Sequence, residues 1–127
     1  MLVVKFGGTS VGKPERMKKI ANLVTGMPGK KIVVLSALSG TTNTLVAIGD
    51  ALLKKDLPKA EHEIAGLENH YLRFVNELYS TDAYKAIGQE IVSRFFIFIR
   101  MLAAGTFDDK SYRELLAQCE LMSTEMF

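Results

Sequence analysis

The chain has 127 residues, a formal net charge of +2 at pH 7, 48% hydrophobic and 24% charged residues, which is ordinary for one soluble domain. So small a charge excludes binding of nucleic acid by charge alone, and the most apolar window, residues 95–105, is too short to span a membrane. We therefore expect neither a nucleic acid nor a membrane as partner. The single Cys119 excludes an internal disulfide and no secretory signal pattern opens the chain, so we expect a cytoplasmic protein.

The first 35 residues have the pattern of a strand, a loop, a helix and a second strand. Residues 1–6 are short and β-branched and lead into Gly7-Gly8, which predicts a strand followed by a glycine turn. Pro14 suits the first position of a helix of about three turns. The continuous apolar run at residues 32–35 is typical of a parallel strand covered on both faces. Both strands should therefore end at one edge of a parallel sheet, where ligands bind.

The remainder of the chain is helical in pattern. Residues 44–53 predict one helix, and apolar residues spaced three and four apart from Leu57 to Leu78 predict a long amphipathic one. Asp82 is expected to cap a further helix that stops at Gly105, and these two long helices should pack antiparallel. The apolar positions of the second are Ile87, Ile91, Phe95, Phe98 and Leu102. We assign them to the core and to no chemistry.

The last segment suggests an incomplete domain. A short helical stretch is expected from Asp108-Asp109 to Leu116, and an apolar face then continues to Phe127. Only two strands are evident, whereas a doubly wound sheet usually has about five or six. We therefore expect residues 1–127 to be part of a longer protein.

The first loop has the groups that a phosphate site needs. Residues 5–10 read KFGGTS, so a lysine at a strand end precedes two glycines and two hydroxyls. Glycines allow backbone N–H groups to approach an anion, and an ammonium group neutralises phosphoryl oxygens. An ordinary tight turn explains Gly7-Gly8 equally well. Gly7, Gly12 and Lys13 also match part of a Walker A motif, but Pro14 lacks the hydroxyl and the N–H which that motif requires.

Two further polar segments follow. Residues 36–43 read SALSGTTN and place hydroxyl and amide groups at the same sheet edge, where they could bind a polar ligand or simply cap the next helix. Glu120 is a single acidic residue in an otherwise apolar stretch, which by itself is more typical of a solvated helix face.

Taken together, three segments resemble the aspartokinase family. Residues 5–11 read KFGGTSV, residues 34–43 read VLSALSGTTN against a family pattern VVSAxxGxTN, and residues 120–124 read ELMST against GE-[LR]-[LM]-S. Their order and spacing agree, and the resemblance covers the whole chain. One position differs, because Cys119 occupies the place of the family's usual glycine.

The resemblance implies a fold and an activity. The fold would be α/β, a partial three-layer α/β/α sandwich of the amino-acid kinase type with a helical insertion, lacking the nucleotide-base half and the ACT regulatory domains. The activity would be transfer of the ATP γ-phosphoryl group to the side-chain carboxylate of L-aspartate, in the cytoplasmic biosynthesis of lysine, threonine and methionine. A fragment this short would be inactive alone. A homo-oligomer and feedback regulation are implied for the longer protein.

The resemblance also assigns residues. It implies that Lys5 is catalytic and that Lys5, Phe6, Gly7, Gly8, Thr9 and Ser10 hold the ATP phosphates. Ser36, Thr42 and Glu120 would bind aspartate, with Glu120 facing its ammonium group. No residue is assigned to Mg²⁺. Two other interpretations remain open, a P-loop-like NTP-binding protein and a non-catalytic helical interaction module built on the two long helices.

Overall fold

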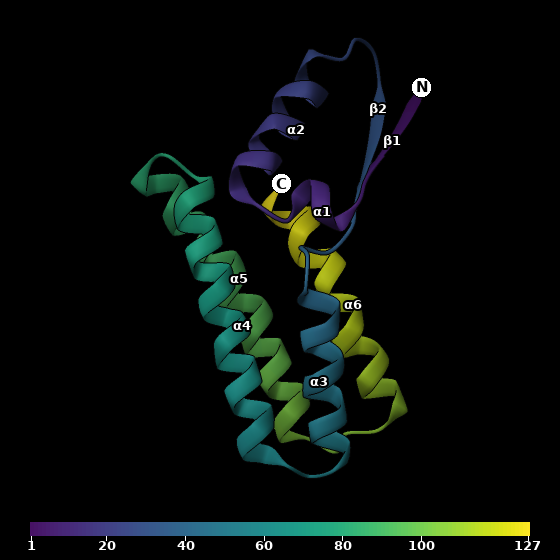
Figure 1. The fold of residues 1–127 in the computed structure, drawn as a ribbon, viewed down its shortest axis with the longest axis vertical. Helices are drawn as coiled ribbons and strands as arrows, with labels where there is room; N and C mark the ends of the chain where they lie inside the picture. The colour runs from purple at the N-terminus through teal and green to yellow at the C-terminus, as the bar shows by residue number, and fades with distance from the viewer.

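The computed structural model describes all residues 1–127 and contains two strands and six helices. In chain order they are β1 Leu2–Phe6, α1 Gly8–Val11, α2 Pro14–Gly26, β2 Lys31–Leu35, α3 Thr41–Leu53, α4 Leu57–Leu78, α5 Asp82–Ala104 and α6 Asp109–Met126. Helices α3 to α6 form an elongated bundle, and the strands with α1 and α2 sit at one end of it (Figure 1). One core cluster of 24 buried residues connects the two parts. None of the helices combines the length and the apolarity needed to cross a membrane.

The two strands pair in parallel, as predicted. Leu2 is opposite Lys31 and Phe6 is opposite Leu35, so both strands end at the same edge. Leu35 is buried and Phe6 packs against the core near Ile20 of α2. The prediction that the second strand is covered on both faces was wrong, because Ile32 and Val34 on its other face are 48% and 42% exposed.

The glycine turn after β1 is a short helix. The carbonyl of Gly7 accepts hydrogen bonds from the N–H groups of Ser10 and Val11, at 3.0 and 3.3 Å, which closes one helical turn as α1. The longer helix α2 begins only at Pro14, as predicted, with Lys13 as its N-cap residue. The N-terminus of a long helix therefore does not follow Gly7-Gly8 directly.

Helix α3 begins three residues earlier than predicted, at Thr41 instead of residue 44. Gly40 precedes it with a left-handed backbone, φ 85°, a conformation that glycine adopts without a steric penalty. No side chain caps the first turn, so the capping explanation of Thr41, Thr42 and Asn43 was wrong. Instead, all three lie inside the first turn of α3, and the Thr44 hydroxyl donates back to the Gly40 carbonyl at 3.1 Å.

The long helices α4 and α5 form the predicted antiparallel pair, joined by residues 79–81 (Figure 1). The N-cap of α5 is Thr81 and not Asp82, since the Thr81 hydroxyl accepts from the N–H of Tyr84 at 3.3 Å. The buried residues of α4 follow most of the predicted stripe, at Ala60, Ile64, Leu67, Tyr71 and Phe74, with Val75 buried in addition. The ends of the predicted stripe differ, because Leu57 is 60% exposed and Leu78 is only partly buried. Burial of this stripe inside the chain removes the reason for proposing a helical interaction module.

The buried stripe of α5 differs from the predicted one. Its buried residues are Gly88, Val92, Phe96 and Ile99. Of the predicted positions, Ile91, Phe95 and Leu102 pack at the margin of the core, Phe98 is half-buried and Ile87 is 51% exposed. Gly88 explains the difference, because a Cβ there would lie 2.4 Å from the ring of Tyr79. The helix thus turns its glycine, and not its larger neighbour Ile87, toward α4.

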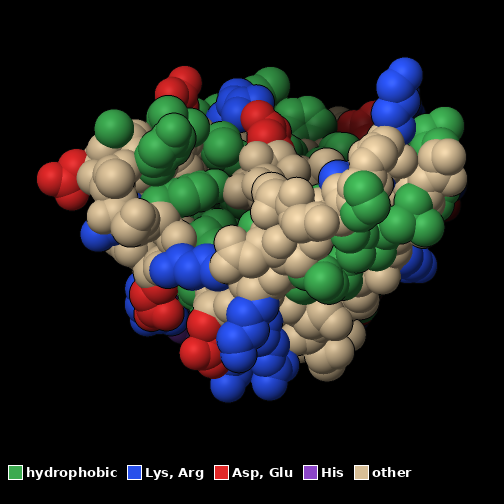
Figure 2. Space-filling model, turned by 90° about the horizontal axis from the view of Figure 1, so that it is seen from above, with side chains coloured by type: hydrophobic (Ala, Val, Ile, Leu, Met, Phe, Trp, Pro, Cys, Tyr) green, Lys and Arg blue, Asp and Glu red, His purple; other side chains and the backbone are tan.

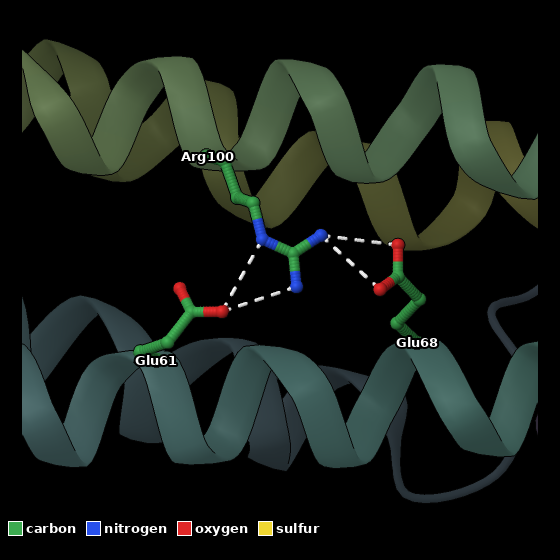
Figure 3. Close-up of polar contacts among 3 residues, drawn as sticks. All are labelled: Glu61, Glu68 and Arg100. Atoms are coloured by element: carbon green, nitrogen blue, oxygen red, sulfur yellow. Dashed lines mark hydrogen bonds and ion pairs between the residues drawn. The ribbon is translucent and has the colours of Figure 1, made fainter.

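Arg100 of α5 joins the two long helices on their outer side. Figure 3 shows its guanidinium group between Glu61 and Glu68 of α4. It donates to Glu68 at 3.1 and 3.2 Å and to Glu61 at 3.2 and 3.3 Å. The hydrogen bonds to Glu68 contribute most to raising the pKa of Arg100 above its usual value. Arg100 thus connects α5 to two positions of α4.

Helix α6 is one continuous helix, where the sequence predicted a short stretch followed by an apolar face. Asp108 caps it, accepting from the N–H of Ser111 at 2.9 Å. Its buried residues reach from Leu115 to Met126, so the helix packs on the core from its middle to its C-terminal end. It runs back toward the strands and ends beside α1 and α2 (Figure 1).

Candidate functional site

The three motif segments meet at the carboxyl edge of the sheet. The N–H of Ser36, directly after β2, donates to the carbonyl of Phe6 at 3.0 Å. The carbonyl of Ser36 accepts a hydrogen bond from the hydroxyl of Ser123 in α6, at 2.8 Å. The ends of β1, β2 and α6 therefore meet around one residue, although Ser36 and Ser123 are 87 positions apart.

Glycines allow the first loop to lie against the second. A Cβ on Gly8 would be 3.1 Å from the carbonyl oxygen of Ala37, and one on Gly12 would be 3.0 Å from the Cβ of Ser39. A side chain at either position would therefore press on the second loop. Gly7 has no atom within 4 Å of its missing Cβ, so space is open above this part of the turn.

Thr9 and Ser10 line a hollow of about 390 Å³ together with Phe6, Arg16, Lys19 and Ile20. Arg16 donates to the carbonyl of Thr9 at 2.9 Å, which attaches the loop to the first turn of α2. Two hydroxyls and two cations are a donor set that suits phosphate oxygens. Sequence reasoning missed Arg16 and Lys19, although their spacing of three residues places them on one face of α2.

The position of Lys13 does not fit a Walker A motif. Lys13 lines a separate hollow of about 600 Å³ between α2 and α4, with Lys18 and Arg73 among its neighbours. Lys13 does not line the hollow that contains Thr9 and Ser10. The lysine of a P-loop must reach the phosphates that its own loop binds, so this geometry speaks against such a site.

The second loop is held from two sides. The hydroxyl of Thr41 makes a buried hydrogen bond of 2.8 Å with the hydroxyl of Tyr71 in α4. Burial raises the pKa of Tyr71 well above its usual value and so keeps the phenol neutral. The hydroxyl of Thr42 points to Sγ of Cys119 in α6 at 3.8 Å, a weak sulfur contact. Sequence reasoning missed Tyr71, whose hydroxyl needs a polar partner because its position is in the buried stripe of α4.

Glu120 follows Cys119 and is exposed on α6. Its carbonyl accepts from the hydroxyls of Ser123 and Thr124, at 3.0 and 2.8 Å, while its carboxylate makes no hydrogen bond or ion pair within the chain. The thiol of Cys119 is buried and donates to the Leu116 carbonyl at 2.8 Å. The backbone of the third motif is thus fixed, and the Glu120 carboxylate is available to a ligand.

The predicted side chains are close to the sheet edge but not enclosed. Lys5 is exposed on β1, and the five main hollows include none of Lys5, Ser36, Thr42 and Glu120. No group of three or more His, Cys, Asp or Glu side chains is placed to hold a metal ion. These four polar side chains therefore lie outside the main hollows of the chain.

The parallel strand pair with its connecting helices gives the chain an α/β fold, and its carboxyl edge, which carries a glycine loop and hydroxyl groups, is where such folds bind ligands. Residues 1–99 match the model of the amino acid kinase family, and the chain belongs to that family. The expected α/β class is thereby confirmed, and the P-loop interpretation is not supported.

The similar proteins are aspartokinases. The chain is 31% identical to chloroplastic aspartokinase 2 of Arabidopsis thaliana over 98% of its own length and 23% of that protein. It is also 31% identical to lysine-sensitive aspartokinase 3 of Escherichia coli, over all of its length and 27% of that protein. It therefore spans about a quarter of the curated relatives that it matches.

Two solved structures resemble the chain along almost its whole length. E. coli aspartokinase III in complex with aspartate and ADP, in the R-state, superposes with a TM-score of 0.81 and 29% identity over 99% of this chain and 27% of that one. The same enzyme with lysine and aspartate, in the T-state, gives a TM-score of 0.80 and 30% identity over the same shares.

Proposed function

We propose that this chain carries the aspartate side and part of the phosphate site of an aspartate kinase, which transfers the ATP γ-phosphoryl group to the side-chain carboxylate of L-aspartate. The product is 4-phospho-L-aspartate. The observation that carries the proposal is the hydrogen bond from Ser123 to the Ser36 carbonyl, because it brings the third motif to the strand ends where the first two already meet. The aspartokinase relatives and the two solved neighbours support it.

The reaction asks for positioning and charge neutralisation. A carboxylate with an ordinary pKa of about 4 is already ionised at neutral pH, so the acceptor needs no general base. ATP with Mg²⁺ supplies the phosphoryl group and part of the neutralising charge. Lys5 is proposed to stabilise the charge on the transferring group, and the open Gly7-Gly8 turn gives phosphate oxygens access to the backbone. Phe6, Thr9 and Ser10 complete this side beside Arg16.

Aspartate recognition is proposed for Ser36, Thr42 and Glu120. An acidic side chain opposite the substrate ammonium supplies specificity, because an analogue without that ammonium leaves a charge unpaired. The Glu120 carboxylate fits the role, since it has no partner within the chain and follows Cys119, which touches Thr42. Its place on a fixed helical backbone supports a defined orientation toward the substrate.

Residues 1–127 correspond in this proposal to the amino-terminal part of the catalytic domain. The nucleotide-base pocket, the ligands of Mg²⁺, the ACT regulatory domains and the contacts of a homo-oligomer would be supplied by other parts of the protein. The 127-residue chain should be inactive alone. The proposed place of action is the cytoplasm, in the biosynthesis of lysine, threonine and methionine, with feedback regulation by a product of that pathway.

The test is an assay of the complete gene product with ATP, Mg²⁺ and L-aspartate. Hydroxylamine traps an acyl phosphate as a hydroxamate, so we expect hydroxamate and ADP to form in equal amounts only when L-aspartate is present. L-glutamate and D-aspartate are the matched control substrates. ADP release without hydroxamate would indicate nucleotide hydrolysis and contradict the proposal.

A further inference from the structure

A buried hydroxyl pair links the long helix α4 to the start of α3. Tyr71 and Thr41 are 0% and 1% exposed, and their hydroxyl oxygens are 2.8 Å apart. They are separated by 30 positions along the chain, so only the packing of α4 against α3 brings them together. Neither hydroxyl makes another hydrogen bond with the protein. Each hydroxyl is therefore the only protein partner of the other at a buried position.

The pair is placed where the second loop becomes a helix. Thr41 is the first residue of α3 and directly precedes Thr42, which is proposed to bind aspartate. Before it, Gly40 has a left-handed backbone, and no side chain caps the turn. The first turn of α3 thus has no N-cap hydrogen bond from a side chain. The hydrogen bond between Tyr71 and Thr41 is the buried polar contact that attaches this turn to α4.

The Tyr71 side chain is closely packed within its helix pair. Tyr71 lies within the buried stripe of α4, between Leu67 and Phe74, and its ring also packs on Phe96 of α5, with ring centroids 6.1 Å apart. Because the ring is fully buried, the Tyr71 hydroxyl has a defined position from which it bonds to Thr41. The weak contact from Thr42 to the Cys119 sulfur, at 3.8 Å, holds the next residue much less firmly.

We propose that Tyr71 is a positioning residue for substrate binding: it fixes Thr41 and so holds the next residue, Thr42, in place for contact with aspartate. This inference rests on the proposed aspartate kinase function. Under this inference the α4–α5 pair supports the substrate site, although neither helix contributes a predicted site residue. Loss of the bond should weaken aspartate binding and leave the phosphate side unchanged.

The test compares Tyr71→Phe with the wild-type complete gene product. This change removes one oxygen and keeps the ring, so the fold is retained. We expect the KM for aspartate to rise about fivefold, as for one lost buried hydrogen bond, while kcat and the KM for ATP stay within twofold. Thr41→Val should raise the aspartate KM by the same factor, and the double variant should raise it no more than either change alone. Thr41→Ser keeps the hydroxyl, so its aspartate KM should equal that of the wild type.

Tyr112→Phe is the matched control. It also removes a tyrosine hydroxyl bonded to α3, but at Val46 and Asp50, farther along the helix. Its aspartate KM should stay at the wild-type value. Hydrogen exchange gives a second measurement, because Tyr71→Phe should speed exchange of the amides of residues 41–44 and Tyr112→Phe should not.

The outcomes separate the two proposals. A wild-type protein that makes no aspartyl phosphate refutes the proposed function itself. A wild-type protein that does make it, combined with a Tyr71→Phe variant whose aspartate KM and exchange at residues 41–44 are unchanged, overturns the positioning role alone. Equal loss of aspartate affinity in Tyr71→Phe and Tyr112→Phe also overturns that role, since it would reflect general destabilisation of α3.

Discussion

Hydroxyl groups of single residues determine how the site segments are attached to one another. Ser123 has a fully buried side chain, and its one hydroxyl proton is within hydrogen-bonding reach of the carbonyls of Ser36, at 2.8 Å, and Glu120, at 3.0 Å. This attaches the backbone of α6 to the strand end without using the side chains proposed to meet substrate. Ser36 and Glu120 therefore keep their polar side-chain atoms available for a ligand.

Lys5 provides the first prediction at this scale. In the complete gene product, Lys5→Ala should lower kcat about 100-fold or more, because a preorganised charge at the transferring group is lost. Lys30→Ala is the control, since it removes an exposed lysine at the opposite end of the strands, where Lys30 precedes β2. Steady-state kinetics on both variants decide the matter, and a near-normal kcat for Lys5→Ala would exclude the catalytic role.

Glu120 provides the second prediction. Glu120→Gln keeps the shape of the side chain but removes its charge, so the KM for aspartate should rise about tenfold or more while the KM for ATP changes little. Glu114→Gln, a neutralised carboxylate one to two turns earlier on the same helix α6, should leave both values unchanged. An unaltered aspartate KM in Glu120→Gln would mean that this residue serves only as a solvated helix position.

Most of the helices and strands could be predicted from the sequence, because the spacing of apolar residues indicates which face of an element is buried. The strands, α2, α4 and the extent of α5 follow from residues such as Pro14 and from the stripe between Leu57 and Leu78. Helix α1 could not, because a helical turn closed by the Gly7 carbonyl leaves no periodic signal in four residues. The early start of α3 depends on the backbone angle of Gly40, which the residue type permits but does not dictate.

Contacts between elements far apart in the sequence could not be predicted either. Three motifs predicted which segments form the site, yet the partners of Thr41 and Thr42 are on α4 and α6, far along the chain. The prediction of the buried stripe of α5 was wrong because Gly88 is buried against the ring of Tyr79 but has no apolar side chain that would indicate this in the sequence. Periodicity counts apolar side chains, so it does not detect a position that is buried because it is small.

Gly88 leads to a prediction about the α4–α5 pair. Gly88→Ala should lower the free energy of unfolding by about 1 to 3 kcal/mol, because the new Cβ would be 2.4 Å from the Tyr79 ring and 3.1 Å from Val75. Gly66→Ala in α4 is the matched control. It meets no atom within 4 Å, so it should raise stability by about 0.5 to 1 kcal/mol through helix propensity. Urea denaturation of both variants measures the difference, and a Gly88→Ala protein as stable as the wild type would contradict the close packing.

For the whole molecule, the dominant feature is the contrast between a well-packed bundle and an uncovered sheet. Viewed from the end that carries the strands and α2, apolar side chains reach the surface between lysines and arginines (Figure 2). Val3, Ile32 and Val34 on the outer sheet face are 63%, 48% and 42% exposed. With only two strands, each strand also has an unpaired edge. Apolar faces and free edges of this kind favour association.

We therefore expect the 127-residue chain, expressed alone, to self-associate or to be marginally stable. Sedimentation velocity should show a larger species that increases with concentration. Replacing Ile32 and Val34 together by threonine keeps a high strand propensity while making the face polar, so it should shift the chain toward monomer. Ile97→Thr with Met101→Gln is the control, because these residues are 61% and 65% exposed on α5, away from the sheet. A wild-type chain that stays monomeric at all concentrations and unfolds in one cooperative transition would show that the bundle core alone stabilises it and that the exposed sheet face has no effect on assembly.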